Sequence, residues 1–216
     1  MDAGFAAIVG TGWASGINLY GTVLLLGIFG RMDLAPVPEV LTSWPVIIVA
    51  ATLYLIEMVA DKIPWLDSGW DVVHTAIRPI GAAVLGAVLA GEADISALLS
   101  AGTSGGMAFA SHATKASTRV AINASPEPVS NVVVSLFEDG LVAVMMWLVV
   151  EQPVLAAILA VVFLIAGATL VFFLWRLVRS GWKRLREGRS PTAGGPPTVR
   201  PPDPPPVQRV GSNGPT

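Results

Sequence analysis

The sequence predicts an all-α integral membrane protein. Its 216 residues are 53% hydrophobic and 13% charged, and the mean hydropathy is +0.67. The apolar runs recur at about the 20 residues that a helix needs to cross a bilayer. We therefore expect lipid, rather than a globular core, to cover most of the apolar surface.

About six transmembrane helices are predicted. Six of the 13 Lys and Arg residues fall between Arg176 and Arg189, directly after the last apolar run, which favours a cytoplasmic C-terminus. An even number of crossings then puts both termini in the cytoplasm, as expected for a multi-pass protein of the bacterial cytoplasmic (inner) membrane. The predicted spans are residues 6–29, 44–60, 70–91, 95–114, 130–150 and 153–177.

The third predicted span is polar in its first half. Side chains such as Asp71, His74 and Arg78 share one helix face before the apolar part begins at Ile80, and Pro79 stands between the two parts. This pattern favours a broken or re-entrant helix, because proline interrupts helical hydrogen bonding. A plain amphipathic segment at the membrane surface is the alternative.

An internal similarity links the two halves of the chain. Glycines four apart occur at Gly12 and Gly16 in the first span and again at 102 and 106 in the fourth, while Glu57 and Glu138 occupy related places in the second and fifth. We interpret this as two inverted three-helix repeats, an arrangement that builds a transport site between the halves. Ordinary close packing of helices also explains the glycines.

Composition divides the chain into two parts. Residues 1–189 are predicted to form the polytopic transmembrane domain with its basic juxtamembrane end. Residues 190–216 are rich in proline and are predicted to be a disordered cytoplasmic tail, because this composition cannot bury apolar surface.

Basic side chains form a candidate anion site. His112, Lys115 and Arg119 follow one another at helical spacing with hydroxyl residues around them, and Arg78 lies at a similar level. Such donors suit a phosphate or carboxylate, so we predict an anionic small molecule or a lipid head group as substrate. Alternatively, Lys115 and Arg119 extend to the membrane surface and only set the orientation.

Acidic side chains form a candidate coupling site at the same level. Glu57, Asp61, Glu138 and Asp139 lie inside or at the edge of apolar stretches, where a charge costs at least about 2.5 kcal/mol without compensation. We expect them to bind protons or cations during transport. A purely structural network of salt bridges is the alternative.

Three smaller side chains are predicted to line the path. Ser15 and Asn18 lie near the middle of the first span, and Ser104 lies in the fourth. Ser104 also belongs to a Gly-x-Ser-Gly pattern typical of intramembrane serine proteases. His112, however, is eight residues away, about 12 Å along the same helix.

With no cysteine and few histidines, we predict no metal, no cofactor and no nucleic-acid partner.

Several short motifs together resemble a known family. They are Gly-x-x-Ala-Ser-Gly-Ile-Asn-Leu-Tyr at 11–20, Ala-Asp-Lys-Ile-Pro with a following Asp and His at 60–74, Arg-Pro at 78, His-x-x-Lys-Ala-Ser-x-Arg at 112–119 and Ser-Pro-Glu-Pro-Val-Ser-Asn at 125–131. Over roughly residues 5–175 they resemble the bacterial inner-membrane family catalogued as domain of unknown function four-one-two-six. The resemblance implies a multi-spanning membrane protein and supplies no catalytic residues.

The leading functional hypothesis is a small transporter or lipid-head-group translocator for an anionic substrate, coupled to protons or cations. A homodimer is expected, because six short helices enclose little space, and membrane lipids are the other predicted partner. A non-transporting membrane scaffold is the first alternative, and an intramembrane hydrolase that uses Ser104 is the second.

Overall fold

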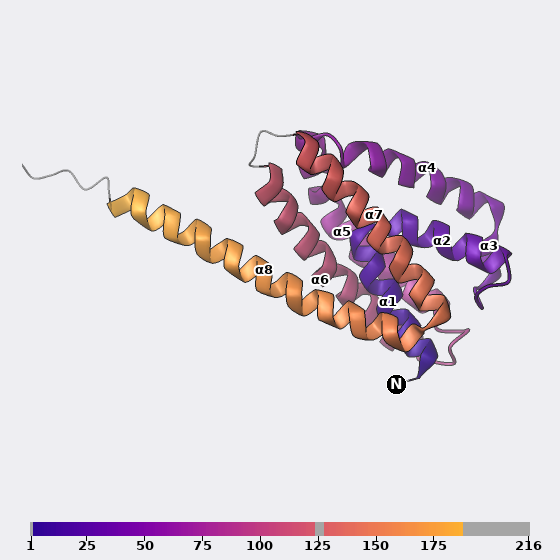
Figure 1. Ribbon diagram of the computed structural model, residues 1–216. Coiled ribbons are helices and arrows are strands. Elements are labelled where there is room, and N and C mark those ends of the chain that lie inside the picture. The colour runs from indigo at the N-terminus through magenta and orange to yellow at the C-terminus, as the bar shows by residue number, and fades with distance from the viewer. Residues whose placement is uncertain (1, 124–127, 188–216) are drawn as a thin grey trace, which may run out of the picture. The chain divides into compact units, whose positions relative to one another are not determined.

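The computed structural model describes residues 2–123 and 128–187. All regular secondary structure within these ranges is helical (Figure 1), which confirms the all-α part of the prediction, whereas the six spans are not confirmed. The predicted tail over 190–216 lies outside the described residues. The helices are α1 (Ala3–Ile17), α2 (Leu19–Arg31), α3 (Glu39–Thr42), α4 (Trp44–Ala60), α5 (Pro64–Leu89), α6 (Ala97–Asn123), α7 (Pro128–Glu151) and α8 (Pro153–Glu187).

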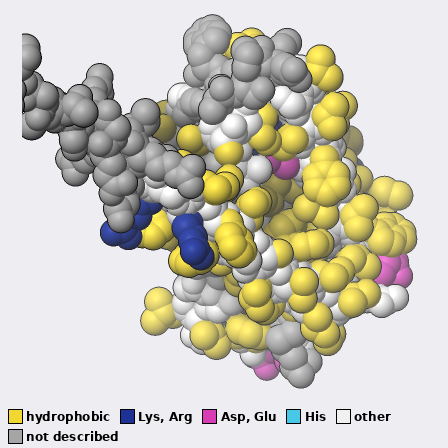
Figure 2. Space-filling view, turned by 60° about the vertical axis from the view of Figure 1, so that its left-hand side comes forward, with side chains coloured by type: hydrophobic (Ala, Val, Ile, Leu, Met, Phe, Trp, Pro, Cys, Tyr) yellow, Lys and Arg dark blue, Asp and Glu magenta, His cyan; other side chains and the backbone are white. Residues whose placement is uncertain are grey.

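Length and composition make this a membrane-type helical protein. Within the described ranges, Gly69–Leu89, Val129–Glu151 and Pro153–Ser180 are long and apolar enough to cross a bilayer, and α1, α2 and α4 are shorter apolar helices. Hydrophobic side chains cover most of the face seen in Figure 2, where acidic side chains appear at few points. Such a surface suits lipid better than water.

The first apolar stretch is not the single span predicted over 6–29. Asn18, with φ −150° and ψ 100°, leaves the helical conformation and separates α1 from α2. A cavity at one end of the bundle is lined by Gly4 and Ala93 and also by Leu26 of α2. Because both outer ends of α1 and α2 lie at this end, the pair forms a helical hairpin whose tip is Asn18.

The local sequence explains the break at the tip. The Asn18 side chain accepts a hydrogen bond from the Gly21 amide at 2.8 Å and caps α2, while the Asn18 amide donates to the Ala14 carbonyl at 2.9 Å and completes α1. Asparagine competes well for backbone groups in this way. The 15 residues of α1 and the 13 of α2 are about 22 and 20 Å long, each too short for a full crossing.

Helices α4 to α7 run between the two ends of the bundle, and α8 begins at the cavity, which Pro153 helps to line. At the end opposite the cavity, Asp61 follows the last residue of α4 and lies beside Arg119 of α6 and Asn131 of α7. Gly167 of α8 packs against Thr114 of α6. Residues up to Leu177 form one compact unit.

The predicted interruption of the third span is wrong. Helix α5 is continuous from Pro64 to Leu89, with Pro79 inside it. The interruption lies instead in the first apolar stretch, at Asn18. The sequence contained the signal, since Asn18 stands among apolar residues and prefers capping positions, but proline was the more conspicuous helix breaker.

The two glycine pairs pack differently. A Cβ atom on Gly12 would lie 2.7 Å from the Ser104 Cα, and one on Gly16 would collide with the backbone of Ala108, so α1 and α6 touch closely along this face. Around Gly102 and Gly106 a Cβ atom would meet nothing within 4 Å. The inverted repeat stays a prediction.

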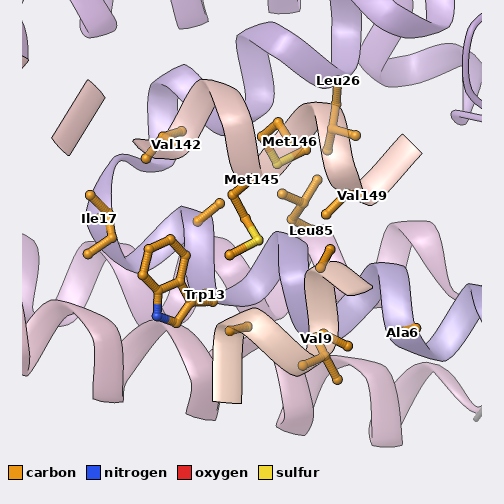
Figure 3. Packing of buried hydrophobic residues seen from close by; sticks show 14 of the residues in the cluster. Ala6, Val9, Trp13, Ile17, Leu26, Leu85, Val142, Met145, Met146 and Val149 are labelled. Carbon is orange, nitrogen blue, oxygen red and sulfur yellow. The ribbon is translucent and has the colours of Figure 1, made fainter. Parts of the chain in front are cut away.

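Apolar packing holds the hairpin against α7. Trp13 of α1 and Leu26 of α2 surround Met145 and Met146 of α7 (Figure 3), and all four side chains are buried. The Trp13 ring also lies 5.2 Å from the ring of Phe163 in α8. Large buried aromatic and sulfur-containing side chains of this kind fix the position of the tip.

Candidate functional site at the hairpin tip

Ionisable side chains from α4, α5 and α6, together with α7, meet at the tip of the hairpin. Arg78 stands near the middle of the candidate span Gly69–Leu89, and its side chain is 0% exposed. Charges in such a place require partners or a hydrated cavity. The buried ionisable residues are Glu57, Asp61, Asp71, His74, Arg78, His112, Lys115 and Arg119.

Arg78 is the hub on the α5 side. Its Nη2 atom donates to Glu57 Oε1 at 2.8 Å, and both side chains are fully buried. Its Nη1 atom lies 3.1 Å from the Gly16 carbonyl oxygen and 2.7 Å from His112 Nδ1. Asp71 adds a longer ion pair at 3.7 Å. One guanidinium therefore joins three helices and the hairpin, which its fixed fork of donors allows.

Lys115 and Arg119 form a second hub one turn apart on α6. Lys115 Nζ is 2.8 Å from Asp61 Oδ2 and 3.4 Å from Glu138 Oε2. Arg119 Nη2 pairs with Glu138 Oε2 at 2.5 Å and with Asp61 Oδ2 at 3.4 Å, and Nη1 donates to Asn131 Oδ1 at 2.7 Å. Two carboxylates are thus shared by two cations, so a change at one residue alters the whole network.

Backbone carbonyls at the end of α1 belong to the same network. Lys115 Nζ donates to the Ile17 carbonyl at 3.2 Å, beside the bond from Arg78 to Gly16. The Ser111 hydroxyl donates to the Trp13 carbonyl at 2.8 Å. The last carbonyls of a helix lack helical partners and carry its negative dipole end, so cations suit this position.

Three aromatic side chains, those of Tyr20, Trp70 and His74, form a cluster beside the start of α2. The Tyr20 hydroxyl lies 3.0 Å from His74 Nε2, and His74 Nδ1 lies 2.9 Å from the Trp70 carbonyl oxygen. The Trp70 and His74 rings are stacked, with centroids 4.7 Å apart. This cluster fixes the start of α2 against the polar half of α5.

Some buried polar atoms of the network have no hydrogen-bond partner among the described residues. They include Glu57 Oε2, Asp61 Oδ1 and Arg78 Nε. Buried groups of this kind are uncommon and call for an explanation. Here the carboxylate oxygens can accept a proton, and the guanidinium nitrogen can donate to a further acceptor.

Most of the predicted site residues come together. Arg78, His112, Lys115 and Arg119 meet Glu57, Asp61 and Glu138 within the ion-pair network. Asp139 joins through the Asn18 amide, which donates to it at 3.1 Å. The cations, however, contact the chain's own carboxylates. Their roles in binding and coupling stay predictions.

Two predicted lining residues lie outside this network. The Ser15 hydroxyl donates to the Thr11 carbonyl of its own helix at 2.8 Å. Ser104 is buried between Gly12 of α1 and Gly86 of α5. Both serines serve the close packing of helices, where small residues are preferred.

Sequence reasoning missed Asn131 and the helix-end carbonyls. Asn131 accepts from Arg119 and donates to the Asp61 carbonyl at 2.9 Å. It precedes Glu138 by seven residues, two helical turns, so the shared face was a usable signal. Nothing in the sequence indicated that Gly16 and Ile17 end a helix beside these cations, because their side chains are apolar.

No histidine lies within hydrogen-bond reach of Ser104 among the described residues, so the structure does not support the hydrolase alternative. Ser104 Oγ has no hydrogen-bond partner among the described residues, while His112 and His74 are bonded to Arg78 and Tyr20. A serine nucleophile needs a base within hydrogen-bond reach. Within residues 2–123 and 128–187, no group of three or more His, Cys, Asp and Glu side chains could hold a metal ion.

Comparison with known proteins identifies the family. No curated protein matches the chain, and no solved structure does. A family model described as "Domain of unknown function (DUF4126)" matches residues 5–175. This range contains the hairpin and every residue of the ion-pair network, and the chain belongs to this family.

Proposed function

We propose that the protein is a proton-coupled transporter of a small anion, whose own carboxylates occupy the cationic positions in the resting state. Protonation of Glu57, Asp61 and Glu138 would weaken their hold on Arg78, Lys115 and Arg119. An anion could then take the place of the carboxylates. The observation that carries the proposal is the largely buried charge network at the tip of the α1–α2 hairpin.

The position of the network supports transport over a purely structural role. Re-entrant segments and broken helices are tolerated at membrane depth where they are buried in protein or line a cavity, and transporters place them at binding sites. Arg78 follows Gly69 by nine residues and precedes Leu89 by eleven, about 14 and 16 Å along the helix. The hub is thus close to mid-depth of this span.

The balance of charges supports proton coupling. The described ion pairs join four carboxylates, Glu57, Asp61, Asp71 and Glu138, to three cations. Asp139 adds a fifth carboxylate, and the neighbouring Lys62 donates to the Met58 carbonyl at 2.7 Å. A network built only for stability gains nothing from surplus acid. The surplus carboxylates give the site groups that can take up protons.

Proton and anion binding would be linked in this arrangement. A neutral carboxylic acid holds a guanidinium or ammonium far less strongly than a carboxylate does. An empty site would therefore keep its carboxylates charged, and a loaded site would hold protons and the anion together. If only the proton or only the anion were bound, charges would be left unpaired in a medium of low dielectric. The two would therefore be carried together, which is symport.

The proposal includes a membrane topology that differs from the six crossings expected at first. Helices α4 to α8 would cross the inner membrane, and the α1–α2 hairpin would enter and leave on one side. With the basic end of α8 in the cytoplasm, the N-terminus would then face outward. Membrane lipids and a second copy of the chain remain the proposed partners, with an anionic small molecule or lipid head group as substrate.

Proteoliposomes test the proposal directly. Purified protein would be reconstituted with an internal pH-sensitive dye, and inorganic phosphate or sulfate would be added outside in an acidic buffer. We expect one of these anions to drive internal acidification. Glu57→Gln should abolish the signal, whereas the matched control Glu92→Gln should retain it, since Glu92 is exposed in the turn after α5.

A binding measurement separates transport from the scaffold alternative. A ligand that binds the folded protein raises its thermal stability, so the same anions should raise the Tm more at pH 5 than at pH 8. If no anion changes the Tm at either pH and no proton flux is seen, the network is structural and the proposal is wrong.

A further inference from the structure

One nitrogen of Arg78 is shared between the hairpin tip and a histidine. Arg78 Nη1 lies 3.1 Å from the Gly16 carbonyl oxygen and 2.7 Å from His112 Nδ1. Gly16 is the second-last residue of α1. The nitrogen therefore connects the end of α1 to α5 and α6 at a single point.

The contacts fix the protonation state of His112. A guanidinium has donors only, so His112 Nδ1 must be the acceptor and carries no proton. The other nitrogen, Nε2, lies 3.2 Å from the Asp71 carbonyl oxygen. A carbonyl only accepts, so Nε2 carries the proton. His112 is thus neutral, in the Nε2–H form, while Arg78 holds this position.

Protonation of His112 is incompatible with the same contact. An imidazolium carries a proton on Nδ1 and would present a donor, and a positive charge, to Arg78 Nη1 at 2.7 Å. Two donors cannot bond each other, and two like charges at this separation repel strongly where water is excluded. Either the proton or the guanidinium contact is present, but not both.

The surrounding charges determine which arrangement is favoured. Arg78 of α5 and Lys115 of α6 oppose a positive His112, whereas the Asp71 backbone carbonyl of α5, which lies 3.2 Å from Nε2, favours it. His74 of α5 also opposes the positive charge, and its ring nitrogens contact Tyr20 and the Trp70 carbonyl. If Arg78 moved away from His112, it would keep its pair with Glu57, because that bond uses Nη2.

We propose that His112 and Arg78 form a proton-operated latch on the re-entrant hairpin. Protonation of His112 at Nδ1 displaces Arg78 Nη1, and the same displacement breaks its bond to the Gly16 carbonyl and loosens the hairpin tip, which Lys115, Ser111 and Asp139 still contact. The latch deepens the proposed function, since it names the residue through which a proton opens the site. Its meaning for transport rests on that function, but the release of the tip can be measured without transport.

Cysteine labelling reports the release, because the chain has no cysteine of its own. Ser15→Cys places a thiol near the tip at a position that is 0% exposed. Its labelling by a methanethiosulfonate reagent in nanodiscs would be compared between pH 8 and pH 5. Ala3→Cys, exposed at the start of α1, corrects for the pH dependence of thiol reactivity. We expect the corrected rate to rise about tenfold or more at pH 5.

Matched histidine variants show whether the latch causes the faster labelling of Ser15→Cys at pH 5. His112→Asn keeps an acceptor oxygen close to the place of Nδ1 but cannot be protonated, so the corrected rate should stay low at both pH values. His74→Gln should leave the rise intact. A rise that persists in His112→Asn, disappears in His74→Gln or is absent from the parent protein overturns the latch.

Hydrogen exchange gives a second readout that needs no substitution. Peptides covering the end of α1 should exchange faster at pH 5 than at pH 8 after correction for the intrinsic rate, while peptides covering the core of α7 should not change. Equal protection of the tip at both pH values contradicts the latch even if His112→Asn fails to fold. A working latch without proton flux in proteoliposomes would refute transport alone.

Discussion

The side-chain amide of Asn18 donates to Asp139 Oδ1 at 3.1 Å, across 121 positions of the sequence. The same asparagine caps α2 through its oxygen, which accepts from the Gly21 amide at 2.8 Å. Asn18 therefore stands between the end of α1 and the start of α2, and its side chain both caps α2 and bonds the hairpin tip to α7. Substitutions at this position should test how the hairpin is held.

Asn18→Asp separates the two contacts of the asparagine. Aspartate still caps α2, but it places a carboxylate beside Asp139 in place of a donor. We expect the Tm in detergent to fall more at pH 8 than at pH 5, because protonation removes the repulsion. Asn18→Ala should cost about 1–3 kcal/mol. An equal loss at both pH values for Asn18→Asp would show that the contact with Asp139 is unimportant.

Glycine substitutions should separate the two glycine pairs. Gly12→Ala puts a methyl group 2.7 Å from the Ser104 Cα, so α1 and α6 must move apart, and overpacking of this kind typically costs about 1–3 kcal/mol. Gly102→Ala meets nothing within 4 Å and should stabilise the helix by about 0.4–1 kcal/mol. Thermal unfolding of both variants in the same detergent gives the comparison. Similar losses would contradict the close contact at Gly12.

A double-mutant cycle measures the shared ion pair of Lys115 and Asp61, whose side chains meet at 2.8 Å. Removal of one partner leaves a buried charge, so Lys115→Met and Asp61→Asn should each cost about 3–5 kcal/mol. The double variant should be more stable than the sum of the two losses implies. Additive losses would show that the two residues act independently. Glu92→Gln is a suitable control, because Glu92 is exposed.

Ser104→Ala should be tolerated. The buried hydroxyl has no hydrogen-bond partner among the described residues, and the removal of such a group is nearly neutral or stabilising. Transport should also persist, and a serine-directed probe should not label the parent protein. Labelling of Ser104 that the alanine variant loses would instead support the hydrolase alternative.

Hydrophobicity and charge placement were enough to predict the class of protein and most members of the network. Glu57, Glu138 and His112 stood out in the sequence because ionisable residues are costly in apolar helices. Their partners could not be assigned in the same way. The pairing of Lys115 with Asp61, and of Arg78 with Glu57, depends on which helix faces come together.

The course of the first apolar stretch depended on tertiary contacts. Its length suggested one crossing, and a single asparagine in it is compatible with a straight helix. The reversal at Asn18 becomes favourable only through packing against α6 and α7 and through two hydrogen bonds. In these, Arg78 and Lys115 donate to the carbonyls of Gly16 and Ile17, which have no partner within α1.

The amino-acid sequence by itself determined that this chain is helical, suited to a membrane, and equipped with acids and bases at similar depth, because composition and helical spacing are local properties. The tertiary structure decided that the first stretch is a helical hairpin, and that the cations face the chain's own carboxylates and the carbonyls at its tip. The physical reason is that charges buried away from water must find partners, and only the folded arrangement of helices determines which partners are within reach.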